Sequence, residues 1–201
     1  MPSFYFLAVF IPVFLAAITI HEFSHGMVAY WLGDSTARER GRLTLNPFRH
    51  IDPLWTLVLP VLLVAAGLPA IGMARPVPVD FSRLRHPKSD MIWVALAGPL
   101  ANILLAFAIT ALYRRTGCQI LLYAVYFNLG LATFNLLPVP PLDGSRVLTG
   151  LLPLNLAYEY VKIEKFGFLI TLVLLWFGII WRFVVPGINF FCKWWHIPLL
   201  G

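Results

Sequence analysis

The chain has 201 residues, of which 60% are hydrophobic and only 12% are charged, and its mean hydropathy is +0.81. This composition excludes an ordinary soluble protein and indicates an integral membrane protein. The formal net charge is +6, but the basic residues lie in loops, which fits membrane orientation and not a nucleic-acid surface. We expect an all-α, polytopic helical bundle with short β-strands, forming a single membrane-embedded domain over residues 1–201.

Apolar segments divide the chain, and each has close to the ~20 residues that cross a bilayer as a helix. The first has no basic region and no clear cleavage site before it, so we interpret it as a retained span and not as a signal peptide. The five segments cover about 4–32, 54–74, 91–113, 119–137 and 166–185.

The first apolar segment contains the sequence His21-Glu22-Phe23-Ser24-His25. A helix places residues four apart on one face, so both imidazoles can reach one metal ion while Glu22 lies beside the water that zinc would hold. The alternative is a chance match in which two buried histidines are satisfied by hydrogen bonds. A charged glutamate in a span costs about 3 kcal/mol or more, which favours a functional metal site.

Polar loops follow the first and second apolar segments. Residues 42–45 alternate polar and apolar side chains, which predicts a short strand. Residues 76–79 read Pro-Val-Pro-Val, which excludes a central strand but allows an edge strand. An exposed edge of this kind could bind an unwound substrate by strand addition.

The segment 54–74 contains two prolines and two glycines, and its path decides the topology. If it crosses once, the Lys and Arg residues divide eight to seven between the two sides, which gives no orientation signal. If it is re-entrant, eleven of the fifteen share one side. The positive-inside rule prefers the re-entrant path, with the eleven in the cytoplasm and the N-terminus outside.

A third metal ligand must come from outside the motif, and Asp143 is the candidate. Phe4 and His21 are separated by about 26 Å of helix, and Gln119 and Leu137 by about 27 Å. The two metal-bearing regions therefore meet only if both helices enter the membrane from the same face. The re-entrant path satisfies this condition and strict alternation does not.

Three motifs together resemble the site-2 protease family of intramembrane zinc metalloproteases, in the minimal subgroup without a PDZ or CBS domain. They are HEFSH at 21–25, AGPLAN at 97–102 and NLLPVPPLDG at 135–144. They span most of a catalytic core of about 4–150, which a C-terminal span and interfacial tail at 166–201 follow.

The resemblance implies one Zn²⁺ per chain, bound by His21, His25 and Asp143, with Glu22 as the catalytic base. It also implies that the protein cleaves transmembrane or membrane-near segments of other proteins in the cell membrane, with its active site toward the cytoplasm. Five further residues are candidates: Asn135, Pro138 and Pro140 for binding substrate backbone, and His50 and Asn102 for an undefined role near the site.

Other interpretations stay open. Another membrane HExxH protease would take its third ligand from a later glutamate, Glu159 or Glu164. A metal transporter or sensor would need polar residues spread along a path through the membrane. An inactive scaffold is expected to have lost Glu22 or a ligand, and all are present.

Overall fold

The computed structural model describes residues 4–52, 54, 58, 62, 65 and 75–201, with side chains from residue 11 onward. The predicted re-entrant segment 54–74 therefore lies almost entirely outside the described residues. Its two flanks are described and they are adjacent, because the amide of Arg75 donates to the carbonyl oxygen of His50 at 2.9 Å. The chain thus comes back after residue 74 to the place that it left after residue 50.

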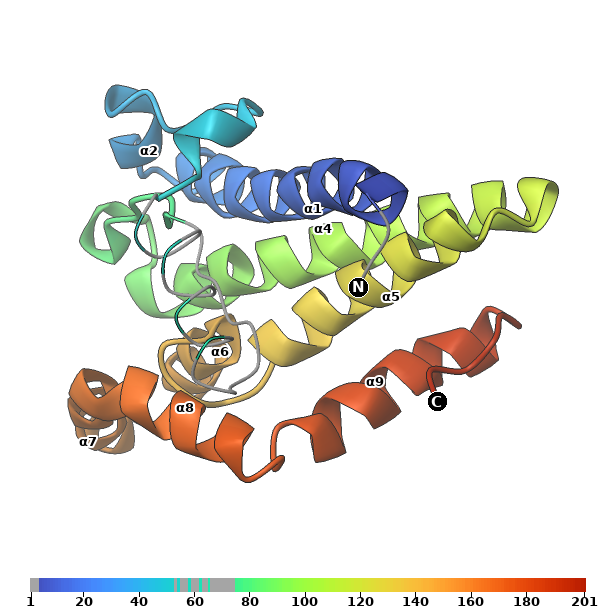
Figure 1. The fold of residues 1–201 in the computed structure, drawn as a ribbon. Helices are drawn as coiled ribbons and strands as arrows, with labels where there is room; N and C mark the ends of the chain where they lie inside the picture. Colours follow the sequence, from blue (N-terminus) through green and yellow to red (C-terminus); the bar gives the residue numbers. More distant parts are fainter. Residues whose placement is uncertain (1–3, 53, 55–57, 59–61, 63–64, 66–74) are drawn as a thin grey trace.

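Three long helices form the centre of the molecule and follow the predicted apolar segments (Figure 1). They are α1 (Phe4–Trp31), α4 (Pro87–Thr116) and α5 (Gln119–Asn135). Helix α4 packs against both of the others, and α1 and α5 begin at the same end of the bundle and run in the same direction. The reversal from α4 to α5 occurs at Gly117, whose φ of 65° is accessible to glycine without strain.

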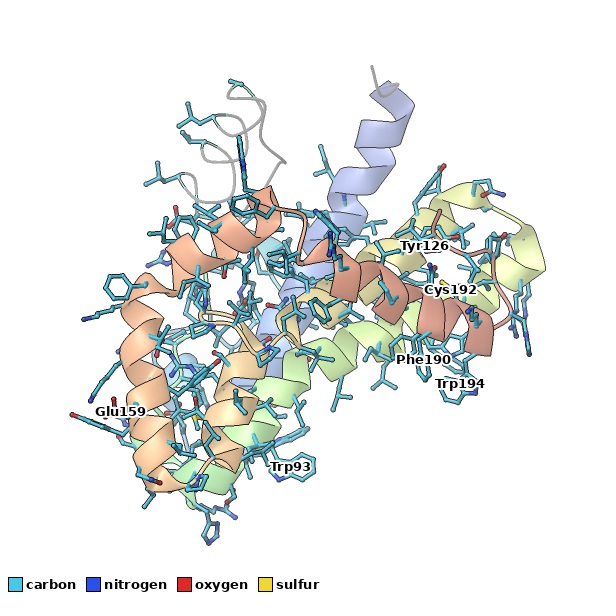
Figure 2. All side chains as sticks on the ribbon, turned by 90° about the horizontal axis from the view of Figure 1, so that it is seen from below. Trp93, Tyr126, Glu159, Phe190, Cys192 and Trp194 are labelled. Carbon is cyan, nitrogen blue, oxygen red and sulfur yellow. The ribbon has the colours of Figure 1, made fainter. Side chains whose placement is uncertain are left out.

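Two helical stretches, Ile11–Trp31 and Pro87–Thr116, are long and apolar enough to cross a membrane. Helix α5 is apolar but has 17 residues, slightly fewer than the ~20 needed to span the hydrocarbon core. Large apolar side chains also cover the outside of the bundle. Trp93, Phe190 and Trp194 point away from it and are 60%, 64% and 69% exposed (Figure 2). A continuous apolar exterior of this kind fits a lipid environment.

The apolar segment 166–185, predicted as one of five membrane-crossing segments, is bent in the structure. It forms α8 (Gly167–Trp176) and the beginning of α9 (Trp181–Trp194), and the helical pair bends by 77° at the break. The break contains Gly178 with a φ of 69°, a conformation that ends a helix. Helix α9 then packs along α5 and closes the main apolar core, whose largest fully buried members include Leu129, Ile180, Val125 and Val184.

Short elements gather at the end of the bundle where α1 and α5 finish (Figure 1). They include α2 (Thr36–Glu39), α6 (Asp143–Leu151) and α7 (Leu154–Lys162). Helix α6 packs against α4. This arrangement brings the start of α6 to the last three turns of α1, which carry the histidines.

The short strands predicted at 42–45 and 76–79 are not formed, and the described part of the chain contains no strand. The amides of Arg42 and Leu43 turn back to the carbonyl oxygen of Ala37, at 2.8 and 3.2 Å, so they cannot join a ladder. Residues 76–79 are extended, but two of their four residues are prolines without an amide proton.

Candidate metal centre

Helix α1 presents His21 and His25 on one face toward α4. Both side chains are buried, at 6% and 8% exposure, and their rings lie 4.7 Å apart in an edge-on arrangement. Their Nε2 atoms are 3.1 Å from each other. The four-residue spacing on a regular helix is sufficient to produce this pairing.

Asp143 is the first residue of α6 and completes the cluster. Its Oδ2 lies 3.1 Å from Nε2 of His21 and 3.2 Å from Nε2 of His25. Glu159 and Glu164, the ligands required by the rival metalloprotease interpretation, instead pair with Lys162 and Arg146. The three-residue cluster of His21, His25 and Asp143 is the candidate cation site in the described chain.

The protonation of the two histidines shows that this cluster suits a cation. Nδ1 of His25 lies 2.7 Å from the carbonyl oxygen of Val94, which can only accept, so Nδ1 carries the proton. Nδ1 of His21 likewise donates to Oδ1 of Asn102 at 2.6 Å. Both Nε2 atoms therefore direct lone pairs toward Asp143 Oδ2, which is buried and accepts no hydrogen bond from the described residues. Nitrogen and carboxylate ligands in a set of three match a catalytic zinc site.

Gly98 on α4 leaves space at this cluster. A Cβ built on Gly98 would lie 2.7 Å from Nε2 of His21, closer than two such atoms can approach. Gly98 therefore has two effects: its small size allows close packing of α4 on α1, and it leaves free the space next to the Nε2 atoms of the two histidines.

A chain of amide hydrogen bonds fixes the ring of His21 from behind. Asn128 on α5 donates its Nδ2 to the carbonyl oxygen of Ala124 at 2.9 Å, so its Oδ1 faces Asn102. Asn102 donates to that Oδ1 at 2.9 Å and to the carbonyl oxygen of Ala17 at 3.1 Å, which leaves its own Oδ1 for His21. Both asparagines are fully buried.

This arrangement gives Asn102, whose role the sequence left undecided, a definite position behind a ligand. Hydrogen bonds to the second ring nitrogen orient a metal-binding histidine and fix its tautomer. Asn128 was missed by the sequence reasoning. The sequence feature that could have identified Asn128 is an amide side chain within an apolar segment, seven residues and so two helical turns before Asn135.

Glu22 lies beside the cluster at the edge of a cavity of about 280 Å³. Its Oε2 accepts a hydrogen bond from the amide of Val77 at 2.7 Å, which fixes the carboxylate to the extended segment 75–80. His21, Asp143 and Asn135 also line this cavity, here called the catalytic cavity. Its remaining lining is largely apolar and includes Ile18, Pro76, Leu131, Phe134, Pro141, Leu142, Phe168, Thr171, Leu172 and Leu175.

The three predicted substrate-binding residues occupy different positions. Asn135 lines the catalytic cavity, and its Nδ2 donates to the carbonyl oxygen of Leu131 at 2.9 Å. Pro138 and Pro140 do not line it. Their carbonyl oxygens, which we expected to bind substrate, instead accept hydrogen bonds within the protein. The donors are the side chains of Tyr160 and Thr171, at 2.9 and 3.1 Å.

His50 lies outside the metal cluster. It is buried at 2% exposure, and its Nε2 donates to the carbonyl oxygen of Thr44 at 2.9 Å. Its own carbonyl oxygen accepts the amide of Arg75. The His50 side chain therefore holds the 44–50 turn together, and its backbone carbonyl joins this turn to the segment that contacts Glu22.

Comparison with known proteins connects this geometry to a family. Residues 115–178 match the model of peptidase family M50. YwhC of Bacillus subtilis is 37% identical over 174 residues, which cover 80% of this chain and 76% of that protein. Rip2 of Mycolicibacterium smegmatis is 32% identical over 206 residues, covering 92% and 77%. The names of both relatives describe zinc metalloproteases. No solved structure is a significant match to the chain.

Proposed function

Because this chain belongs to peptidase family M50, the site-2 protease family, and is therefore a zinc metalloprotease, we propose that it hydrolyses peptide bonds within or near the transmembrane segments of other membrane proteins. The observation that carries this proposal is the convergence of three potential ligand atoms, within 3.2 Å of one another, beside a carboxylate on an apolar cavity. The catalytic core would run over about 4–150.

The residues divide the chemistry as follows. Zinc held by His21, His25 and Asp143 supplies Lewis-acid chemistry, polarising a carbonyl oxygen and acidifying water. Glu22, oriented by the amide of Val77, takes a proton from the attacking water and later delivers it to the leaving amine. The apolar lining of the catalytic cavity excludes other water, which strengthens these electrostatic interactions.

The substrate must arrive locally unwound, because a helix hides its peptide bonds in its own hydrogen bonds. Besides the ligands and Glu22, the described polar side chains that line the catalytic cavity are Asn135 and Thr171. The Thr171 hydroxyl already donates to the carbonyl oxygen of Pro140, so Asn135 is the residue that could hold such an exposed backbone. Its side-chain oxygen is an acceptor for a substrate amide, while its nitrogen is held by the helix. Pro138 and Pro140 would act by shaping the turn that delivers Asp143.

Metal analysis of the detergent-purified protein tests the ligand set without knowledge of the substrate. We expect one zinc per chain in the wild type and in Glu22→Gln, and none in Asp143→Ala. Cleavage of a membrane-protein substrate should be lost in both variants. A wild type that binds no zinc after purification without chelators would reject the proposal in favour of an inactive scaffold, and a fully active Glu22→Gln would reject the role of Glu22.

The same family membership supports a multi-pass membrane protein, and we further propose its orientation in the cell membrane. The re-entrant path for 54–74 places the N-terminus outside and eleven of the fifteen basic residues in the cytoplasm. The hydrogen bond between Arg75 and His50 supports this path because both flanks lie together. Labelling a single cysteine at position 83 with an impermeant reagent on intact cells would contradict it if the cysteine reacted from outside.

A further inference from the structure

A second cavity, of about 480 Å³, lies next to the catalytic cavity and is strongly basic. We name it the arginine pocket. Among the described residues no carboxylate lines it, and the described lining consists of Arg40, Arg42, Arg49, Arg75, Phe48, Ile51, Pro76 and Pro78. The arginines come from two separate stretches of the chain, 40–49 and 75, so the tertiary structure and not a sequence cluster assembles the pocket.

The two cavities are separated by a single extended stretch of chain. Pro76 lines both of them. The next residue, Val77, donates its amide to Glu22, and the preceding carbonyl oxygen, of Arg75, accepts a hydrogen bond from Nη2 of Arg42 at 2.8 Å. A chain that lies in the catalytic cavity and continues over Pro76 therefore enters the arginine pocket.

The charges in this pocket are not balanced by its own lining. Arg42 is 91% buried, and burial together with the neighbouring positive charge of Arg75 lowers the pKa of its guanidinium. The carboxylate of Glu22 offsets part of this lowering of the Arg42 pKa, and Arg49 adds further repulsion. Arg40, Arg49 and Arg75 are all exposed. Arg40 also interacts with Asp80 in the adjoining surface cavity, so Arg49 and Arg75 are the two that we expect an incoming anion to meet. Guanidinium groups bind carboxylates through paired hydrogen bonds.

The backbone of residues 75–78 cannot recognise a passing chain through its amides. The amide of Arg75 donates to the carbonyl oxygen of His50, and the amide of Val77 donates to Glu22. The other two residues, Pro76 and Pro78, lack an amide proton. A substrate strand therefore cannot accept hydrogen bonds from the backbone amides of residues 75–78. Hydrogen-bond donors for a substrate beyond the scissile bond would therefore come from side chains, and the described polar side chains that line the arginine pocket are all arginines.

We propose that the arginine pocket is a specificity subsite that binds an acidic side chain of the substrate on one side of the scissile bond. To reach the arginine pocket, the substrate chain must pass over the single segment of backbone that separates the two cavities. An extended chain advances about 3.3 Å per residue, so the acidic side chain would lie about two to four residues from the cleaved bond. The inference rests on the proposed function, because it names the substrate chemistry of that same site. It predicts that substrates carry Asp or Glu just beyond the cleavage position.

The test uses the purified full-length enzyme, loaded with zinc, in phosphatidylcholine vesicles. The probes are single-span synthetic peptides that share one apolar sequence and differ at one residue, Asp, Asn or Lys, moved stepwise through the four positions on each side of the bond that mass spectrometry shows to be cut. We expect kcat/KM to be about tenfold higher for Asp than for Asn at one position, with Lys the poorest. The gain should appear mainly in KM.

Variants show whether the pocket is responsible. Arg49→Gln combined with Arg75→Gln should bring the ratio of Asp to Asn close to unity, and Arg49→Glu should shift the preference toward Lys. The control is Arg85→Gln, which removes an exposed arginine that lines neither cavity and should keep the Asp preference. Arg42 is left intact, because its contacts with the carbonyl oxygens of Arg75 and Pro76 position the shared wall.

The outcomes are separable. Equal cleavage of the Asp and Asn peptides at every position overturns the subsite and leaves the protease proposal standing. Absence of cleavage of every peptide, with zinc bound, overturns both. Phe48 is 77% exposed in the pocket lining, so an anionic lipid headgroup is the competing occupant. If added phosphatidylglycerol changes the rates through Arg49 and Arg75 while the substrate residue has no effect, the pocket is a lipid site and the proposal fails.

Discussion

Gly98 and His25 face each other across the contact between α4 and α1, and a Cβ built on Gly98 would lie 2.4 Å from Nε2 of His25. The same Cβ would lie 2.7 Å from Nε2 of His21. A single methyl group at position 98 would therefore collide with both of the nitrogen atoms that would hold a metal ion. The contact links the AGP sequence on α4 to metal binding as well as to helix packing.

We predict that Gly98→Ala loses zinc while the protein remains folded. The methyl group cannot be accommodated without moving one of the imidazoles, so elemental mass spectrometry should show close to no metal. Gly130→Ala is the matched control, since its nearest neighbour is a flexible Ile188 methyl at 3.6 Å. Gly130→Ala should keep full metal content. A Gly98→Ala protein that retains zinc would show that the α1–α4 contact relaxes easily.

The hydrogen-bonded pair behind His21 gives a graded prediction. Asn102→Ala removes the acceptor that fixes the tautomer of His21, so zinc affinity should fall about 10–100-fold. Asn128→Ala acts only through Asn102 and should cost less, about threefold to tenfold. Asn189→Ala, which removes an amide that bonds Leu200 far from the site, is the control.

Competition with a fluorescent zinc chelator measures these three affinities on one scale. The expected order of zinc affinity is wild type and Asn189→Ala together, then Asn128→Ala, then Asn102→Ala. Equal affinities in all four proteins would contradict a positioning role for the two asparagines. The measurement depends on metal binding and not on cleavage, so it also separates this role from one in substrate binding.

The bond between Val77 and Glu22 yields a prediction about catalysis. Val77→Pro removes the amide that holds the Glu22 carboxylate, so kcat should fall, by about 10–100-fold for a misplaced proton acceptor. Zinc should remain bound, because no ligand is changed. Val77→Ala keeps the amide but loses the packing of a side chain that is 7% exposed, and it serves as the control for destabilisation.

Turnover of a membrane-protein substrate and zinc content are measured on the same two preparations. A Val77→Ala protein as inactive as Val77→Pro would assign the effect to packing against α1 instead of to the hydrogen bond. A Val77→Pro protein with unchanged kcat would show that Glu22 needs no support from segment 75–80.

The sequence predicted much of the helical frame because apolar length is a local property. Helices α1, α4 and α5 form within a few residues of the predicted segments. The bend of 77° within the segment 166–185 was not predicted, since a hydropathy window cannot detect that Gly178 adopts a positive φ. The strands at 42–45 and 76–79 also failed, because their amides find partners in Ala37 and Glu22 that are not neighbours in the alternating pattern.

The sequence by itself identified this protein as a zinc metalloprotease. The four-residue spacing of His21 and His25 on a helix predicts a pair of metal ligands, with Glu22 beside them as the predicted base and the later Asp143 as the predicted third ligand. Only the tertiary structure decided what supports that set. The Asn128–Asn102–His21 chain, the clearance at Gly98 and the arginine pocket each join segments distant in sequence, and such contacts depend on how helices pack, which no local pattern records.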